Sequence, residues 1–493
     1  MARNFALLLL GEMAGQVVAF LVTAHLARAL GPGGFGIWTF AVSVIVYLTV
    51  VVDAGTEAWG MREVSTRPAR LRPAVAGVVG LRLALAGLAA AAVVTLAAAG
   101  AFGPERGWAL AFGAVSLLGF ALNPAWALRG IEVAAPVAAA NLLQRLVFAG
   151  LAVALVGAPG DVRYTTLWQG VADLAAAGLC LAALVPHGGL PWRAAFRLAR
   201  AWAVLRRSWP MGASRALRGA MSTAGVVVLA YTWPDAVVGE FGAALRLALG
   251  LLLVSSIFGL VVLPATARAC RRGGPEEAKV VTATFHLLGT LLVPLCVGLA
   301  VLAEPVLALV FGPGYAAAAL PLRILMAMVV VMGLSDNLRR VLQARHRQGL
   351  DLRLVVAAAV VGLAVTGPTV WFGGAAGAAA AMLAGESVLM ILAAVAVRRT
   401  GPSGALAASL AGPALAAAVM AAGVLLLRHL SLAVSVPAGA AIYAAMLLLW
   451  RRRLLADLHR LEGGGSLPAG RAGEVLGPAG ERLPPTTQQK ATR

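Results

Sequence analysis

The sequence predicts an all-α membrane protein with about fourteen transmembrane helices. Composition is the first observation behind this prediction: 61% of the 493 residues are hydrophobic, 12% are charged, and the mean hydropathy is +0.89. Soluble globular proteins carry about 25% charged residues, so water is not the main solvent of this chain. The second observation is that apolar runs of about 20 residues, long enough to span a hydrocarbon core, recur between Phe5 and Trp450.

Glycine, proline and charged residues divide these apolar runs and give the predicted helix boundaries. Gly31-Pro32-Gly33-Gly34 separates the first two spans, and Gly373-Gly374 separates the eleventh from the twelfth. The predicted spans are residues 5–30, 35–60, 74–101, 108–128, 137–158, 164–186, 211–233, 239–264, 279–303, 316–335, 353–371, 374–397, 406–427 and 435–450.

Basic residues alternate from loop to loop, which is the third observation. Loops on one side carry Arg62, Arg67, Arg70 and Arg72, then Arg129, then Arg193, Arg197, Arg200, Arg206 and Arg207, then Arg268, Arg271, Arg272 and Lys279, then Arg339, Arg340, Arg345, Arg347 and Arg353, then Arg398 and Arg399. Loops on the other side have only Arg28, Arg106, Arg163 and Arg428. One missed span would exchange the two sets from that point on, so the unbroken alternation supports the helix count. We expect a multi-pass protein of the inner (cytoplasmic) membrane with both termini in the cytoplasm.

Several classes of function are excluded by residue patterns. The net charge of +20 would suggest a nucleic-acid partner in a soluble protein, but here the basic residues lie in short loops and no nucleic-acid-binding motif occurs. Cys180, Cys270 and Cys296 lack metal or redox spacing, and the histidines do not cluster. Paired carboxylates, a nucleophile elbow and a phosphate-binding glycine loop are also missing from the sequence. We therefore expect no enzyme activity, no metal, no cofactor and no nucleic-acid partner.

Two similar motifs divide the predicted helices into two lobes. Gly33-Gly34-Phe35-Gly36 opens the second span and Gly239-Glu240-Phe241-Gly242 opens the eighth, on the same side of the membrane, which indicates a parallel repeat. The expected organisation is a six-helix lobe over 1–186, a basic amphipathic linker over 187–210, a second six-helix lobe over 211–400, two additional helices over 401–455, and a cytoplasmic, largely disordered tail over 456–493. The linker mixes aromatic residues with arginines. This pattern is consistent with an amphipathic helix at the membrane interface and also with a solvated connector between the lobes.

Four motifs occur in a characteristic order: residues 27–36 (ARALGPGGFG), Asp53-Ala54-Gly55, residues 239–246 (GEFGAALR) and residues 311–315 (FGPGY). Their order and spacing resemble those of the oligosaccharide flippase family, the O-antigen and polysaccharide exporters of the multidrug/oligosaccharidyl-lipid/polysaccharide (MOP) superfamily. The resemblance covers residues 1 to about 400. It implies two six-helix lobes in a V-shaped, MATE-like arrangement with two additional C-terminal helices.

The resemblance also implies a function in the lipid bilayer. It implies a flippase that moves a polyprenyl-diphosphate-linked oligosaccharide across the cytoplasmic membrane by alternating access, for cell-surface polysaccharide biosynthesis, with a polysaccharide synthesis complex as a further partner. A multidrug/cation antiporter of the same superfamily is an alternative, although arginines outnumber carboxylates in the spans here. A membrane glycan polymerase or ligase fits less well because the outer loops are short. A non-transporting scaffold of a synthesis complex also stays open.

Charged residues inside predicted spans are the candidate site residues. Each costs about 2.5–3.5 kcal/mol to insert at a helix centre, so it normally faces a cavity or a partner. We expect substrate binding by arginines, whose guanidinium groups bind phosphate oxygens bidentately: Arg246, Arg82, Arg145 and Arg323. Carboxylates are candidates for ion coupling or for ion pairs: Glu12, Asp173 and Glu386.

The ion-pair alternative has definite pairings within each lobe. It joins Arg82 or Arg145 to Glu12 or Asp173, and Arg246 or Arg323 to Glu386. Arg215 and Arg218, near the start of the seventh span, form an entry site or extend to the membrane interface.

The alternation of basic loops predicts the topology directly. Reporter fusions placed after Arg72, Arg207, Arg272 and Arg347 should report the cytoplasm. Fusions near the proline-containing turns of the other side, such as Pro104 and Pro313, should report the outside. A single fusion with the contrary result would show that the span list is wrong at that point.

Overall fold

The computed structural model describes residues 2–189, 198–402, 405–427, 431–449 and 451–462, and these residues are helical almost throughout, with no strand among them. The prediction of an all-α membrane protein is confirmed. Among the described residues, eleven helices are long and apolar enough to cross a membrane.

The first half of the chain forms a group of helices that we call the N-lobe. α1 (Ala2–Asp53) is followed by α2 (Thr56–Thr66), α3 (Leu71–Ala98), α4 (Pro104–Leu122), α5 (Ala125–Gly130), α6 (Ala135–Leu155) and α7 (Val162–Leu184). Short 3-10 turns lie at Pro68–Arg70, Pro159–Asp161 and Val185–His187. Proline occupies the first turn of α4 and α6, where its missing N–H leaves no intrahelical bond unmade.

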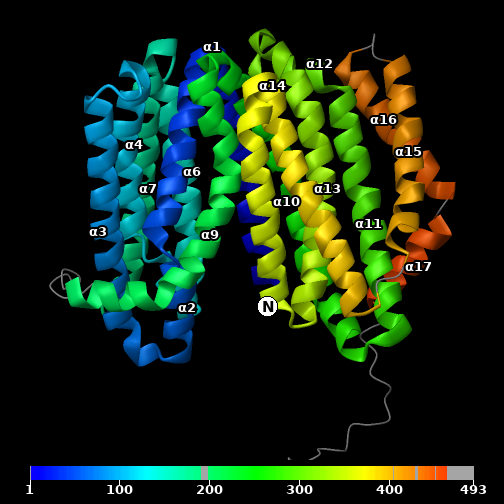
Figure 1. Cartoon of the computed structure of the whole chain (residues 1–493), viewed down its shortest axis with the longest axis horizontal. Coiled ribbons are helices and arrows are strands. Elements are labelled where there is room, and N and C mark those ends of the chain that lie inside the picture. Colours follow the sequence, from blue (N-terminus) through cyan, green and yellow to red (C-terminus); the bar gives the residue numbers. More distant parts are fainter. Residues whose placement is uncertain (1, 190–197, 403–404, 428–430, 450, 463–493) are drawn as a thin grey trace, which may run out of the picture.

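The second half forms the C-lobe and three further helices. The C-lobe contains α9 (Leu198–Thr232), α10 (Asp235–Arg272), α11 (Gly274–Val301), α12 (Ala303–Phe311), a 3-10 turn (Pro313–Ala318), α13 (Ala319–Ala344) and α14 (Gln348–Thr400). α15 (Leu406–Leu426) packs on α11, and α16 (Leu432–Leu449) and α17 (Arg451–Glu462) follow. Figure 1 shows the two lobes side by side, with α15, α16 and α17 at the far edge of the C-lobe.

Two of the helices are too long to cross a bilayer once. α1 has 52 residues and α14 has 53, so at about 1.5 Å per residue each would reach nearly 80 Å against a hydrocarbon core of about 30 Å. Each one turns back at a glycine with positive φ: Gly31 (φ 66°) and Gly374 (φ 53°). Each of these helices therefore holds two crossing segments. Dividing these two helices adds two crossing segments to the eleven, and α9, which is not among the eleven, adds one more. The total agrees with the predicted number of about fourteen.

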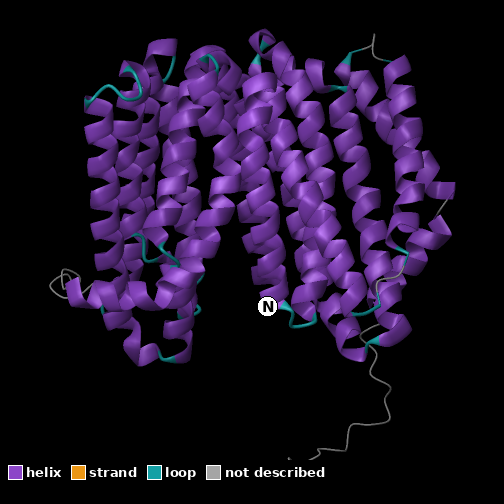
Figure 2. Cartoon of the chain, in the orientation of Figure 1, coloured by secondary structure: helices purple, strands orange, loops and turns teal. Residues whose placement is uncertain are grey.

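The two ends of the bundle are distinguished by the elements that lie there. α1 begins at the end that we call the basic end (Figure 1). α2, which contains Arg62, lies at the same end. The turns within α1 and α14 lie at the opposite end, where Pro32 contacts Gly314 and Gly374 contacts Trp233. Toward the basic end the helices of the two lobes diverge (Figure 2), which is the V-shaped arrangement that the resemblance implied.

The lobes meet at the opposite end through the two repeated motifs. A Cβ atom added to Gly36 in α1 would lie 1.8 Å from the carbonyl oxygen of Asp235, and one added to Gly239 in α10 would lie 2.0 Å from that of Pro32. Only glycine allows α1 and α10 to approach so closely. The motifs that indicated a repeat in the sequence therefore face each other in space.

Side chains reinforce this contact. Tyr315 donates a hydrogen bond of 2.8 Å to the carbonyl oxygen of Ala27, and the Arg28 guanidinium donates to two carbonyls at the end of α12. Arg106 of α4 forms an ion pair of 2.7 Å with Asp235 of α10. Contacts of three kinds, backbone, hydrogen-bonded and ionic, thus hold the lobes together at the opposite end.

Two predicted boundaries differ from the structure. Residues 190–197 of the predicted linker lie outside the described residues, and from Leu198 onward the chain belongs to α9, which lies across the basic end and then turns into the bundle (Figure 1). Pro210 lies within this helix, and proline is a common cause of such bends. The predicted tail begins at residue 456, and its first residues, up to Glu462, belong to α17, whereas the stretch predicted to be disordered begins at about Gly463. Residues 463–493 lie outside the described part.

The close approach of α1 and α10 predicts the effect of enlarging Gly36. Gly36→Val should prevent the lobes from closing at the opposite end, because the new Cβ would overlap the Asp235 carbonyl group. Cysteine labelling from that side of the membrane should increase at positions between the lobes. Gly33→Val is the matched control, since a Cβ at Gly33 meets nothing within 4 Å. Equal labelling of the two variants would contradict the close approach.

Candidate functional site

A buried ion pair lies at the basic end of the N-lobe. Arg82 of α3 and Asp53, the last residue of α1, are each 2% exposed, and their charged groups are 2.5 Å apart (Nη2 to Oδ1). Thr56 donates to the same carboxylate oxygen (3.1 Å) and accepts from Arg82 Nε (2.8 Å). Arg82 therefore has partners on every side, including the ring of Phe120 at 4.6 Å.

The position of Asp53 follows from the local sequence. Ala54 and Gly55 have positive φ values of 45° and 78°, which end α1 and begin α2 in a new direction. The Asp53 carboxylate then accepts the backbone N–H of Glu57 (3.0 Å) in the first turn of α2. An acidic side chain is favourable there, because N–H groups at a helix start lack intrahelical acceptors.

Two further arginines extend this pair into a network. Arg215 Nη1 lies 3.2 Å from Asp53 Oδ2 and 3.1 Å from Glu57 Oε2, and Arg129 Nη1 lies 2.9 Å from Glu57 Oε1. We call Asp53, Glu57, Arg82, Arg129 and Arg215 the basic-end cluster. It holds three guanidinium groups against two carboxylates. The Arg215 side chain is 41% exposed, so the excess positive charge is accessible there.

A backbone contact places Arg215 in the cluster. A Cβ on Gly212 of α9 would lie 2.4 Å from the Ala54 carbonyl carbon, and one on Gly55 would lie 2.4 Å from the carbonyl oxygen of Ser208. α9 therefore touches the α1–α2 junction directly, and Arg215 follows Gly212 by less than one turn. The alternative that Arg215 only extends to the membrane interface does not account for its ion pairs with Asp53 and Glu57. The side chain of Arg218 lies outside the described part.

Arg246 lies in a different environment, on α10 between the two lobes. Its guanidinium carbon stands 5.0 Å from the ring centre of Trp38 on α1. Within the described part of the chain no carboxylate forms an ion pair with it, so the predicted alternative of a pair with Glu386 is wrong. It follows Asp235, the first residue of α10, by eleven positions, which is about 16 Å of helix. Arg246 is thus a cation well inside the bundle that faces an aromatic ring instead of an acid.

The other candidates of the N-lobe have contacts of their own. Asp173 accepts hydrogen bonds from the amides of Gln144 (2.9 Å) and Gln169 (3.3 Å). The expected pair between Asp173 and an arginine is therefore replaced by amide donors. Arg145 lies over Gly15 of α1, where an added Cβ would come within 2.9 Å of its Cδ. The side chain of Glu12 lies outside the described residues.

Arg323 is not inside the bundle. α13 begins only at Ala319, because residues Pro313–Ala318 form a 3-10 turn, so Arg323 lies near the opposite end of that helix. It pairs with Glu304 of α12 (2.9 Å), and both side chains are largely exposed. The expectation that Arg323 binds substrate in the membrane interior or pairs with Glu386 does not agree with this position.

Glu386 belongs to an acidic group inside the C-lobe that the sequence analysis missed. Arg339 of α13 pairs with Asp351 (2.7 Å) and Asp336 (3.0 Å), and a pocket of about 190 Å³ is lined by Asp336, Arg339 and Glu386. This group therefore contains three carboxylates and one arginine that forms ion pairs with two of them. Asp336 and Arg339 were placed in or beside a cytoplasmic loop, although their spacing of three residues on a helix is the signal that could have identified the group.

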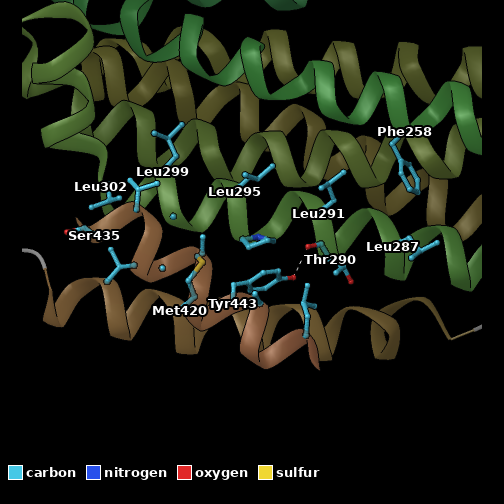
Figure 3. A pocket seen from close by; sticks show the side chains of 18 of the residues that line it. Phe258, Leu287, Thr290, Leu291, Leu295, Leu299, Leu302, Met420, Ser435 and Tyr443 are labelled. Carbon is cyan, nitrogen blue, oxygen red and sulfur yellow. Dashed lines mark hydrogen bonds between the residues drawn. The ribbon is translucent and has the colours of Figure 1, made fainter. Parts of the chain in front are cut away.

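A second pocket, of about 770 Å³, lies between α10, α11, α15 and α16. Figure 3 shows apolar side chains along α11, among them Leu291 and Leu295, and Met420 of α15 and Tyr443 of α16 also line the pocket. This pocket is almost entirely apolar, and nothing in the sequence analysis predicted it. It lies beside the lobes, in the region of the two additional helices.

Two helical lobes meet at one end and diverge at the other, and Arg246 lies between them without an ion pair among the described residues. The chain belongs to the Polysacc_synt family, described as "Polysaccharide biosynthesis protein", whose model matches residues 1–270. The comparison with curated protein sequences gives no match.

Solved structures show the same fold. The structure described as "Lipid II flippase MurJ, inward closed conformation" matches with a TM-score of 0.74 and 12% identity, over 91% of this chain and 100% of that one. An inward-facing multidrug resistance MATE family transporter of the MOP superfamily matches with a TM-score of 0.58 and 16% identity, over 78% of this chain and 94% of that one. The two structures are described as a flippase and a transporter.

The burial of the Asp53–Arg82 pair predicts a stability effect. Asp53→Ala should destabilise the protein by about 3–5 kcal/mol, because it leaves the buried Arg82 charge without its carboxylate. Thermal unfolding in detergent and abundance in the membrane measure this loss. Glu276→Gln is the control, since Glu276 forms an exposed pair with Lys279 and exposed pairs contribute about 1 kcal/mol at most. If Asp53→Ala unfolds at the same temperature as the control, the pair has no structural role.

Proposed function

We propose that this protein is a flippase for a polyprenyl-diphosphate-linked oligosaccharide, which it moves across the cytoplasmic membrane by alternating access. One observation carries the proposal: Arg246 lies between the lobes against the ring of Trp38 and has no acidic partner in the described part of the chain. An arginine in that position suits a diphosphate, which it binds through two parallel hydrogen bonds. The family description and the flippase fold support the same substrate class.

The arrangement of the lobes supports a path for the substrate. The contacts at the opposite end close that side, while the lobes diverge at the basic end, which we take as cytoplasmic. A diphosphate that arrives there first meets the excess charge of the basic-end cluster at Arg215. Arg246 lies deeper, beyond Arg215 on the way to the opposite end. In this mechanism, release requires the Arg106–Asp235 and Arg28 contacts to break as the basic end closes.

The apolar pocket provides a place for the lipid part of the same substrate. It lies outside the space between the lobes, within the segments that cross the membrane. The polyprenyl chain can therefore stay in an apolar environment while the diphosphate and sugars pass between the lobes. A polysaccharide synthesis complex would supply such a substrate at the cytoplasmic side.

The acidic group of the C-lobe favours a second candidate, a cation-coupled multidrug antiporter. Asp336, Asp351 and Glu386 stand against Arg339, and excess carboxylate inside a bundle can hold a proton, a coupling ion or a cationic drug. We propose ion coupling as the role of Glu386 and treat drug binding as the alternative. Drug resistance that depends on Glu386 but is unchanged in Arg246→Ala would favour the antiporter.

The flippase proposal predicts the outcome of substitutions at Arg246. Arg246→Ala should insert normally and lose export of the lipid-linked oligosaccharide, because the change deletes the anion contact and leaves no carboxylate stranded. Arg246→Lys should keep part of the activity, since an ammonium group cannot form the bidentate contact. Export and membrane abundance are measured together in a strain that lacks the native copy.

Arg323→Ala is the matched control, because Arg323 is also an arginine of the C-lobe but pairs with Glu304 at the surface. It should export at the rate of the unmodified protein. Full export by a well-expressed Arg246→Ala variant would remove Arg246 from the substrate site and with it the main support for the proposal.

A further inference from the structure

The last described helix, α17, is attached to the C-lobe by a buried hydrogen bond. Asp457 Oδ2 lies 2.6 Å from Nδ1 of His286 on α11, and the two residues are 3% and 5% exposed. Arg460, one turn further along α17, donates to the other oxygen of the same carboxylate (2.5 Å). Burying a carboxylate costs several kcal/mol unless it is paired, so α17 is held in one register by this contact.

The same contact places Leu458 at the wall of the apolar pocket. Leu458 follows Asp457 directly and lines the pocket together with Leu287, which follows His286 on α11. From Leu287 the pocket extends along α11 to Leu302 (Figure 3), about 22 Å at 1.5 Å per residue. α17 therefore contributes to the wall at the Leu287 end, which is the end nearer the start of α11.

The lining of the pocket has almost no hydrogen-bonding capacity to offer. Tyr443 donates to the carbonyl oxygen of Thr290 (2.7 Å), a bond visible in Figure 3. Thr290 in turn donates to the carbonyl oxygen of His286 (2.8 Å), and Ser435 donates to that of Leu427 (3.2 Å). Since these three hydroxyl groups use their protons within the protein, the pocket suits a ligand without polar groups.

We propose that α17 completes a binding site for a single isoprenoid chain in this pocket, and that the Asp457–His286 bond holds it in position. This inference rests on the proposed function, because the chain it names is the polyprenyl part of the lipid-linked substrate. Asp457 and His286 are positioning residues: they act through Leu458, which contacts the chain. The length of chain that the pocket accepts is then set between Leu302 and α17.

Photolabelling of the full-length protein in liposomes tests the proposal. The probe is a farnesyl phosphate that carries a diazirine at the apolar end, and labelled peptides are identified by mass spectrometry. In the unmodified protein, labels should appear on residues 287–302 and on residues 454–462. Asp457→Ala should lower labelling of 454–462 about tenfold or more, the scale expected for losing a hydrogen bond to a charged group, and leave labelling of 287–302 in place.

Three variants act as controls for folding and for the contact itself. Asp457→Asn keeps an oxygen that can accept from His286 and should keep most labelling of 454–462. Leu458→Ala leaves the bond intact but removes the wall, so it should also reduce labelling of 454–462. Glu276→Gln changes an exposed acid of α11 and should change nothing. If Asp457→Ala fails to insert, Leu458→Ala still provides the test.

The outcomes separate this inference from the proposed function. Labels on 287–302 alone in the unmodified protein would overturn the role of α17, while the pocket and the flippase proposal stand. Equal displacement of the probe by phosphatidylglycerol and by polyprenyl phosphate would show that the pocket holds bilayer acyl chains, which also overturns the inference. Loss of Arg246-dependent export bears only on the proposed function.

Discussion

The cost of burying a charge without a partner determines much of this structure. Arg82 is buried and pairs with Asp53, and Arg345 pairs with Glu277 at 2.7 Å, with both side chains less than a tenth exposed. Each pair joins helices that are distant in the sequence, so the need for a partner also fixes which helices pack together. Arg246 has no such pair among the described residues, and its guanidinium group lies over an aromatic ring. A cation kept without an acid in such a place suits a ligand that supplies the negative charge.

α9 connects the two lobes at both ends of the bundle. It packs against α1 and α3 of the N-lobe and against α14 of the C-lobe. At the basic end it touches the α1–α2 junction at Gly212 and adds Arg215 to the N-lobe carboxylates. Its other end leads directly into α10, where Gly239 meets α1. A movement that opens one end and closes the other therefore has to change the contacts of α9.

The sequence predicted the helices and the repeat, because both depend on local patterns of apolar residues and glycine. The motifs 33–36 and 239–242 were recognised as equivalent, and the structure brings Gly36 of the first motif against Gly239 of the second. Arg246 was selected for its depth, which the helix boundaries alone determine. The partners of charged residues were harder to predict: Asp53 lies at a helix end, where a local role explained it equally well, and its bond to Arg82 depends on how α1 and α3 pack.

Contacts between distant segments explain the other errors. His286 stood alone among apolar residues, and its partner Asp457 lay in the predicted cytoplasmic tail, beyond the last predicted span. A short helix rich in arginine has no packed core of its own, and only the docking on α11 shows that it is ordered. Arg323 was misplaced because Pro313–Ala318 forms a 3-10 turn, which shifts the start of α13 toward the charged residue. None of these features can be derived from local periodicity.

The order in which the basic-end cluster is made follows from where its members stand in the chain. Arg82 and Arg129 follow their carboxylates by 29 and 72 residues, whereas Arg215 follows Asp53 by 162. At about 5–20 residues per second, the ribosome delivers Arg215 roughly 8 to 32 seconds after Asp53. The N-lobe thus already has two arginines for its two carboxylates while the second half is still being translated. The charge that arrives last is the surplus one, so the basic-end cluster is electrically balanced in the newborn N-lobe and gains its excess charge only when α9 docks.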